Sequence, residues 1–197
     1  NPVSGLRNSF GKDRDWRMAE ETLDERADIC YTKDKEVKVE NQTDEKDPLR
    51  VSRQYLQGPM AEFVMKDLVK KAGLTSQFQI ASAATSREEI GNPVYPLARR
   101  KLAEHGIACG GHAARQFINS DYEKYDLLIG MDKANLRDMY RICGGDFADK
   151  IHLLMDYTNH PGEVADPWYT EDFETTWLDV LAGCQGLLGS LYPQLHK

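Results

Sequence analysis

Four cysteines supply the thiols of this 197-residue chain, namely Cys30, Cys109, Cys143 and Cys184. They form no C-x-x-C pair, and none has a histidine neighbour at a zinc-finger interval. A disulfide framework and a cysteine-histidine metal site are therefore not expected, and the sequence indicates no metal and no cofactor. Free thiols are typical of a reducing cytosol, so we expect a cytoplasmic protein.

The start of a helix near Pro59 is a second place where chemistry is expected. An apolar stripe at helical spacing predicts a helix over residues 59–72, which Gly73 can close. Pro59 suits the first helical position, where its missing N–H would be unpaired anyway, and Glu62 would complement the macrodipole in the first turn. In a doubly wound α/β domain, the turn entering the first helix is where a phosphate would sit.

Strand and helix patterns alternate through the remainder of the chain. Short apolar runs predict strands, and amphipathic stretches with caps predict helices. The expected strands are 77–81, 126–131 and 150–155, and the expected further helices are 95–105, 132–142 and 171–191. This alternation predicts an α/β fold with a parallel sheet and right-handed crossovers.

Charge and composition exclude several classes of protein. The net charge of −7 argues against a nucleic-acid surface, and no apolar run is long enough to span a membrane. Residues 1–58 contain 24 charged residues and show no sustained apolar period. We therefore expect a disordered or out-of-frame extension over residues 1–46 and a folded domain over residues 47–197.

Seven short motifs in a fixed order resemble the low-molecular-weight protein tyrosine phosphatases. They are P-M-A-E (59–62), S-A-A-T-S (82–86), E-I-G-N-P (89–93), H-A-A-R-Q (112–116), M-D-x-x-N-L-R-D (131–138), D-P-W (166–168) and D-F-E (172–174). The resemblance extends from about Pro59 to Leu191. It implies a three-layer, doubly wound α/β domain whose four-stranded parallel sheet has helices on both faces, with the first strand replaced or missing in this chain.

The resemblance also implies a two-step phosphoryl transfer on a phosphotyrosine protein or a small aryl phosphate. A cysteine thiolate in a C-x5-R loop attacks phosphorus, and an aspartic acid protonates the leaving phenolate. Asp166 matches that general acid and base, although before Pro167 it would also suit a plain turn. Trp168 and Tyr169 match aromatic residues beside the substrate ring, and Glu88 stands where many relatives carry an aromatic pocket wall.

Three further residues match positions that support the phosphate loop. Ser82 and His112 correspond to residues that brace this loop by hydrogen bonds, and Pro59 follows the loop at the start of the helix. The family needs no metal or cofactor, and nothing in this sequence suggests that nucleic acid or a membrane is a partner.

The nucleophile itself is absent. The residues before Pro59 read V-S-R-Q-Y-L-Q-G and contain neither a cysteine nor a glycine-rich cradle. With chosen synonymous codons for Asp44 to Gln57, a reading shifted by one base encodes Met-Lys-Lys-Ile-Leu-Phe-Val-Cys-His-Gly-Asn-Ile-Cys-Arg. A one-base deletion would then convert the family's Ser-Pro into Gly58-Pro59. We hypothesise a frameshift that removed the first strand and the cysteine loop.

Cys109 and Arg115 form a second, formal C-x5-R match. No buried strand runs into Cys109, Gln116 replaces the expected hydroxyl residue, and no clear helix start follows, so we regard this match as a decoy. Two alternatives to an inactive phosphatase stay open. An arsenate reductase on the same fold would need further redox cysteines, and a catalytically dead binding module would need none. The segment 48–56 is a candidate substitute strand, which Pro48 weakens.

Overall fold

The computed structural model describes residues 27–32, 57–167 and 172–193. Four strands form one sheet in the order β2-β1-β3-β4. They are β1 (Ala27–Thr32), β2 (Gln79–Ala84), β3 (Leu127–Gly130) and β4 (Ile151–Leu153). The helices are α1 (Gln57–Lys71), α2 (Pro96–Glu104), α3 (Ser120–Lys124), α4 (Lys133–Cys143) and α6 (Phe173–Leu191), with single 3₁₀ turns η1 (Thr75–Gln77) and η2 (Leu154–Tyr157).

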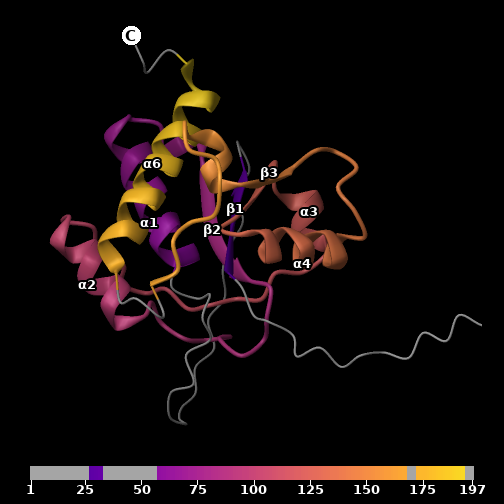
Figure 1. Ribbon diagram of the computed structural model, residues 1–197, viewed down its shortest axis with the longest axis horizontal. Helices are drawn as coiled ribbons and strands as arrows, with labels where there is room; N and C mark the ends of the chain where they lie inside the picture. Colours follow the sequence, from indigo (N-terminus) through magenta and orange to yellow (C-terminus); the bar gives the residue numbers. More distant parts are fainter. Residues whose placement is uncertain (1–26, 33–56, 168–171, 194–197) are drawn as a thin grey trace, which may run out of the picture.

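The elements form three layers, which confirms the predicted α/β class. Helices α1, α2 and α6 lie on one side of the sheet, and α3 and α4 lie on the other (Figure 1). Two apolar clusters correspond to these two sides. Ile80 and Ile129 join the cluster that holds α1 and α6, whereas Ala83 and Leu128 join the cluster that holds Met139 of α4. This alternation follows from the period of two along a strand, which sends successive side chains to opposite faces.

The direction of β1 differs from the prediction of a fully parallel sheet. β3 and β4 are parallel, but β1 pairs antiparallel with both β2 and β3. The central position is thus occupied by residues 27–32, inside the stretch for which we expected no packed structure. The candidate strand 48–56 lies outside the described residues, and the domain boundary at residues 46/47 stays a prediction.

Local signals predicted α4 best. Asp132 accepts hydrogen bonds from the backbone N–H groups of Ala134 and Asn135 at 2.9 and 2.8 Å, and Gly144 ends the helix with φ of 73°. The bounds of other elements differ more from those predicted. β2 extends to Ala84, although the run S-A-A-T-S suggested a loop. The small residues of this run have low β-propensity, but they pair in a buried strand, where packing outweighs propensity. The short helix α3 was not predicted.

Helix α6 lies against η2 with no space between them. A Cβ at Gly186 would overlap the carbonyl group of Tyr157, and one at Gly183 would press on Leu154. On the same helix Trp177, Val180 and Cys184 are buried as expected. The predicted partners Leu187 and Leu188 are also buried, whereas Phe173 and Leu181 are only partly covered. In the described part of the chain, no helix has the length and apolarity required to cross a membrane.

Candidate functional site

The first turn of α1 is buried and begins earlier than predicted. Gln57, Gly58 and Pro59 are all covered, and the helix starts at Gln57, so that Pro59 is its third residue. The first N–H groups of a helix have no partner within the helix, so proline is tolerated throughout this turn. The same unpaired N–H groups and the macrodipole make the turn suitable for an anion.

The loop that carries Asp166 is attached to this turn. The Gln57 side chain donates hydrogen bonds from Nε2 to the carbonyl oxygens of Val164 and Ala165, at 3.3 and 2.9 Å. The backbone N–H of Val164 donates to the carbonyl of Met131, just after β3, at 2.9 Å. Asp166 follows Ala165 in this loop, and its side chain is exposed. The predicted ring contacts, Trp168 and Tyr169, lie outside the described residues.

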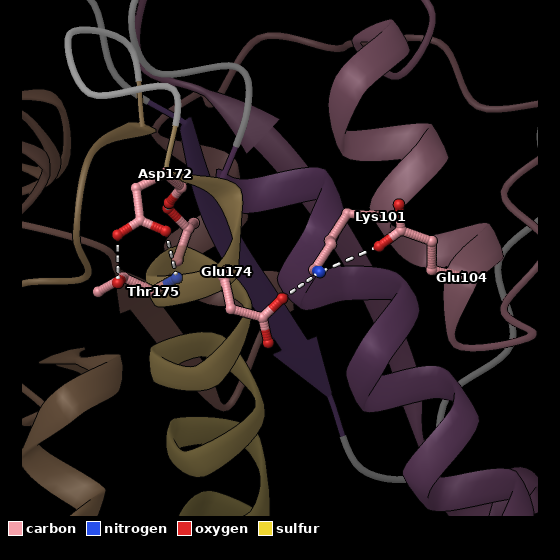
Figure 2. Close-up of polar contacts among 6 residues, drawn as sticks. Lys101, Glu104, Asp172, Glu174 and Thr175 are labelled. Carbon is pink, nitrogen blue, oxygen red and sulfur yellow. Dashed lines mark hydrogen bonds and ion pairs between the residues drawn. The ribbon is translucent and has the colours of Figure 1, made fainter.

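The D-F-E motif starts helix α6 and ties it to α2 (Figure 2). Asp172 accepts hydrogen bonds from the N–H and the hydroxyl of Thr175, at 3.0 and 2.6 Å. These two bonds lower the pKa of the Asp172 carboxyl. Lys101 of α2 pairs with both Glu174 and Glu104. The motif is thus a helix cap and a bridge between helices, and it fixes the end of the segment that carries Asp166.

Ser82 and His112 meet at a buried carboxylate of α1. Glu62 accepts hydrogen bonds from the Ser82 N–H and hydroxyl at 2.9 and 2.6 Å, and its Oε2 lies 3.5 Å from Nδ1 of His112. It also pairs with Lys66 one turn further on. Because α1 begins at Gln57, Glu62 lies beyond the first turn, and it is buried rather than facing solvent at the helix end. The triad of Ser82, Glu62 and His112 joins β2, α1 and the loop before Ala114.

Burial and pairing act in opposite directions on the ionisation of this triad. Burial alone would raise the pKa of the Glu62 carboxyl, but Lys66 and the Ser82 hydroxyl bring that pKa below its ordinary value. For His112, burial lowers the imidazole pKa and outweighs the opposing attraction of Glu62. Glu62 is therefore charged and His112 neutral at pH 7.

Glu88 lies on the exposed loop after β2, where it lines a hollow of about 650 Å³. Arg87, Asp138 and Arg141 also line it. The described residues around this hollow include none from α1 and none from the loop that carries Asp166. The predicted contact of Glu88 with substrate is not tested.

The thiols whose side chains are described belong to α4, α6 and the loop after α2, and none belongs to the start of α1. Cys184 is fully buried in α6, where its Sγ lies 3.6 Å from the carbonyl of Ala61, and burial raises its thiol pKa. Cys143 ends α4. Cys109 is buried in a loop, but Arg115 of the same formal match binds Asp121 at 2.8 Å instead of returning to the thiol. This geometry supports treating Cys109 as a decoy.

The direction of β1 also matters for the site. Thr32, its last residue, pairs with Gln79 at the start of β2, whereas Ala27 pairs with Ala84 at the end. β1 therefore ends at the sheet edge opposite the carboxyl end of β2. The chain leaves β1 at the edge away from the place where ligands bind in open α/β sheets.

Comparison with known proteins decides the family. Residues 46–197 match the profile described as low molecular weight phosphotyrosine protein phosphatase. The chain belongs to this family. It is 33% identical over 138 residues to the low molecular weight protein-tyrosine-phosphatase YfkJ of Bacillus subtilis, covering 69% of this chain and 88% of that protein. It is 36% identical over 135 residues to the phosphatase of the same family from Gallus gallus, covering 66% and 85%.

Solved structures agree with the sequence relatives. The crystal structure of YfkJ from Bacillus subtilis superimposes with a TM-score of 0.67 at 31% identity, covering 71% of this chain and 89% of that one. The phosphatase SP-PTP from Streptococcus pyogenes gives a TM-score of 0.60 at 31% identity, covering 72% and 91%. The names of these relatives class this chain with the protein tyrosine phosphatases, which are hydrolases.

Sequence reasoning missed three residues that hold the Asp166 loop, namely Gln57, Thr176 and Asp179. None of them belongs to a motif that carried the resemblance, and their contacts join residues that are distant in sequence. The role of Glu62 was also misjudged. Its spacing of four residues from Lys66 was a local signal of an ion pair, but its contacts with Ser82 and His112 had no local signal.

Proposed function

We propose that this domain is built to hydrolyse phosphotyrosine or small aryl phosphates through a phosphocysteine, and that the chain as written does not complete the reaction. In the first step a thiolate would form the S–P bond while the ester oxygen leaves with the proton of Asp166. In the second step water attacks phosphorus, Asp166 takes the proton, and phosphate and the thiolate are released. The proposed setting is the cytoplasm.

The attachment of the Asp166 loop to the first turn of α1 is the observation that carries the proposal. The bond from Gln57 Nε2 to the Ala165 carbonyl, 2.9 Å long, holds the residue before Asp166 at the helix N-terminus. An anion at that N-terminus would be stabilised by the N–H groups and the macrodipole. A carboxyl group beside it could then serve a leaving oxygen as general acid.

The missing nucleophile supports the second half of the proposal. No cysteine occurs between Asp44 and Gly58, and β1 ends at the far edge of the sheet. Without a thiolate the covalent path is lost, and only positioning and electrostatic effects are left. Ser82, His112 and Pro59 are proposed to support the loop in an intact protein, with Trp168, Tyr169 and Glu88 bordering the substrate.

The test starts with the DNA across codons 44–60. If the shifted frame encodes the cysteine loop, the frame is restored and p-nitrophenyl phosphate hydrolysis is measured with both chains. We expect turnover by the restored chain and a rate lower by about four to six orders of magnitude for the chain as written.

Two outcomes would overturn the proposal. Turnover by the chain as written that persists in Cys109→Ala and is lost in Asp166→Ala would show another nucleophile. An inactive, folded restored chain would argue against the phosphatase mechanism. DNA that is intact and has no cysteine loop in any frame would instead indicate a family member that binds without catalysing, which calorimetry with phosphate or vanadate would then examine.

A further inference from the structure

Helix α6 binds both backbone polar groups of Ala165, the residue before Asp166. Thr176 donates a hydrogen bond from Oγ1 to the carbonyl oxygen of Ala165 at 2.8 Å. Asp179 accepts one at Oδ2 from the N–H of Ala165 at 2.9 Å. The two side chains are three residues apart, so they lie on the same face of α6. Both backbone groups of Ala165 are therefore satisfied by one helix.

These contacts lie in a covered part of the molecule. Thr176 has no exposed surface, and Asp179 is half-buried. Val164, one residue earlier, donates its N–H to the Met131 carbonyl at 2.9 Å. The loop is thus tied to the end of β3 at one residue and to α6 at the next, immediately before the exposed Asp166.

Helix α6 is itself held in place at two points along its length. Its N-terminus is capped by Asp172 and bridged to α2 through Glu174 and Lys101 (Figure 2). Further along, Gly186 leaves no room for even a Cβ against the Tyr157 carbonyl. A helix held at both places presents Thr176 and Asp179 at constant positions, which is what orienting a neighbouring loop requires.

We propose that Thr176 and Asp179 are positioning residues that set the orientation of Asp166 through the backbone of Ala165. This inference rests on the proposed role of Asp166 as general acid. Neither side chain is assigned a contact with substrate. Loss of the Asp179 bond would remove the acceptor of the Ala165 N–H, and loss of the Thr176 bond would leave the Ala165 carbonyl to Gln57 Nε2 alone. Either change would spread the Asp166 carboxyl over more orientations, so that a smaller fraction of molecules could donate the proton.

The first test uses the chain as it exists and does not depend on activity. Amide hydrogen exchange at Ala165 is compared among Asp179→Ala, Asp179→Asn and the unmodified chain. Asparagine keeps an acceptor oxygen and is the matched control. We expect exchange to rise about 10- to 100-fold in Asp179→Ala, as fits loss of a hydrogen bond to a charged group, and to stay near the original rate in Asp179→Asn. Unchanged exchange in Asp179→Ala would overturn the inference.

The second test uses the frame-restored chain and two leaving groups. Thr176→Val removes the hydroxyl, and Thr176→Ser keeps it. A misplaced general acid affects a poor leaving group most, so kcat/KM for phenyl phosphate should fall about 10-fold more than that for p-nitrophenyl phosphate in Thr176→Val and Asp179→Ala. Thr176→Ser and Asp179→Asn should restore both values.

Equal losses on the two substrates would show a merely structural role and would overturn the inference. If Thr176→Val does not fold, the Asp179 pair decides the question by itself. An inactive restored chain would contradict the proposed function, whereas the exchange result at Ala165 would still test the contacts independently.

Discussion

The chain reaches the first turn of α1 from two directions, and the two differ in how they are built. From the C-terminal side, the loop before Asp166 is held by Gln57, Met131 and the two α6 side chains. From the N-terminal side, β1 occupies the central position of the sheet but runs the opposite way. The loop that carries the proposed general acid is therefore tied to the start of α1, whereas β1 ends at the opposite edge of the sheet.

The sheet and the proposed site need different things from the strand between β2 and β3. Backbone pairing in the sheet requires a strand between β2 and β3 and is satisfied by either direction, because N–H and C=O groups alternate along both kinds of ladder. The proposed mechanism needs a strand parallel to β2 and β3, since such a strand ends next to the helix N-terminus, whereas β1 ends at the opposite edge of the sheet. A substitute strand can thus complete the fold without completing the site.

The largest expected effect concerns Asp166. In the frame-restored chain, Asp166→Asn should lower kcat by about 10²- to 10⁴-fold, because the general acid and base is lost. Hydrolysis of p-nitrophenyl phosphate measures it, with Cys109→Ser as a control that should leave kcat unchanged. A restored chain that tolerates Asp166→Asn would show that the C-terminal half of the site is not catalytic.

The second-largest effect is expected on stability, from a substitution in the antiparallel strand β1. Ile29 lies opposite Ser82 and Ile129 in the sheet, so Ile29→Pro removes a ladder hydrogen bond and should lower the free energy of unfolding of the chain as written by about 3 kcal/mol. Urea unfolding measures it, and Ile29→Ala, which keeps the N–H, separates the backbone effect.

Equal stability of Ile29→Pro and Ile29→Ala would show that residues 27–32 do not hold a central position of the sheet.

A somewhat smaller effect is expected where α6 meets η2. Gly186→Ala should destabilise the fold by about 2–3 kcal/mol, because its Cβ would overlap the Tyr157 carbonyl and the helix would have to shift. Thermal or urea unfolding measures it. Gly162→Ala is the matched control, since a Cβ there meets nothing within 4 Å. Equal stability of the two variants would contradict the close contact.

The smallest effect is a dependence of stability on pH. Burial lowers the pKa of His112, so the unfolded chain binds this proton at a higher pH than the folded chain. The contribution is fully present above the unfolded value of about 6.5 and is lost as the pH falls toward the folded pKa. Glu62, whose folded pKa is also lowered, adds a loss in the same direction at more acidic pH, below its ordinary 4.5.

Urea unfolding between pH 7.5 and 5.5 measures the histidine contribution. The free energy of unfolding should fall over this interval in the unmodified chain and fall less in His112→Gln. His160→Gln is the control, because His160 is exposed. An unchanged slope in His112→Gln would show that burial does not govern this imidazole.

Local patterns predicted much of the fold because their causes are local. The cap of α4 depends on Asp132 and two N–H groups within three residues of it, and the closing helix depends on an apolar stripe along its own length. Boundaries failed where the neighbours decided them. β2 includes Ser82 and Ala83, which have low strand propensity but pair in a buried sheet.

The motifs indicated Asp166, Ser82 and His112 as site residues. In the structure the residue before Asp166 accepts a hydrogen bond from Gln57 at the start of α1, and Ser82 and His112 both lie against Glu62. Their catalytic and supporting roles stay predictions. The contacts of Gln57, Thr176 and Asp179 were not foreseen, because a hydrogen bond from Gln57 to Ala165 joins residues 108 positions apart and leaves no periodic trace in the sequence.

The sequence by itself determined the family, the alternation of strands and helices, and the lack of a cysteine between Asp44 and Pro59, because these depend on residue types and short spacings. The tertiary structure alone decided that residues 27–32 complete the sheet in reverse, that Glu62 gathers Ser82 and His112, and that α6 holds the Asp166 loop. Such pairings follow from which buried polar groups can satisfy one another in space, and no local pattern records that.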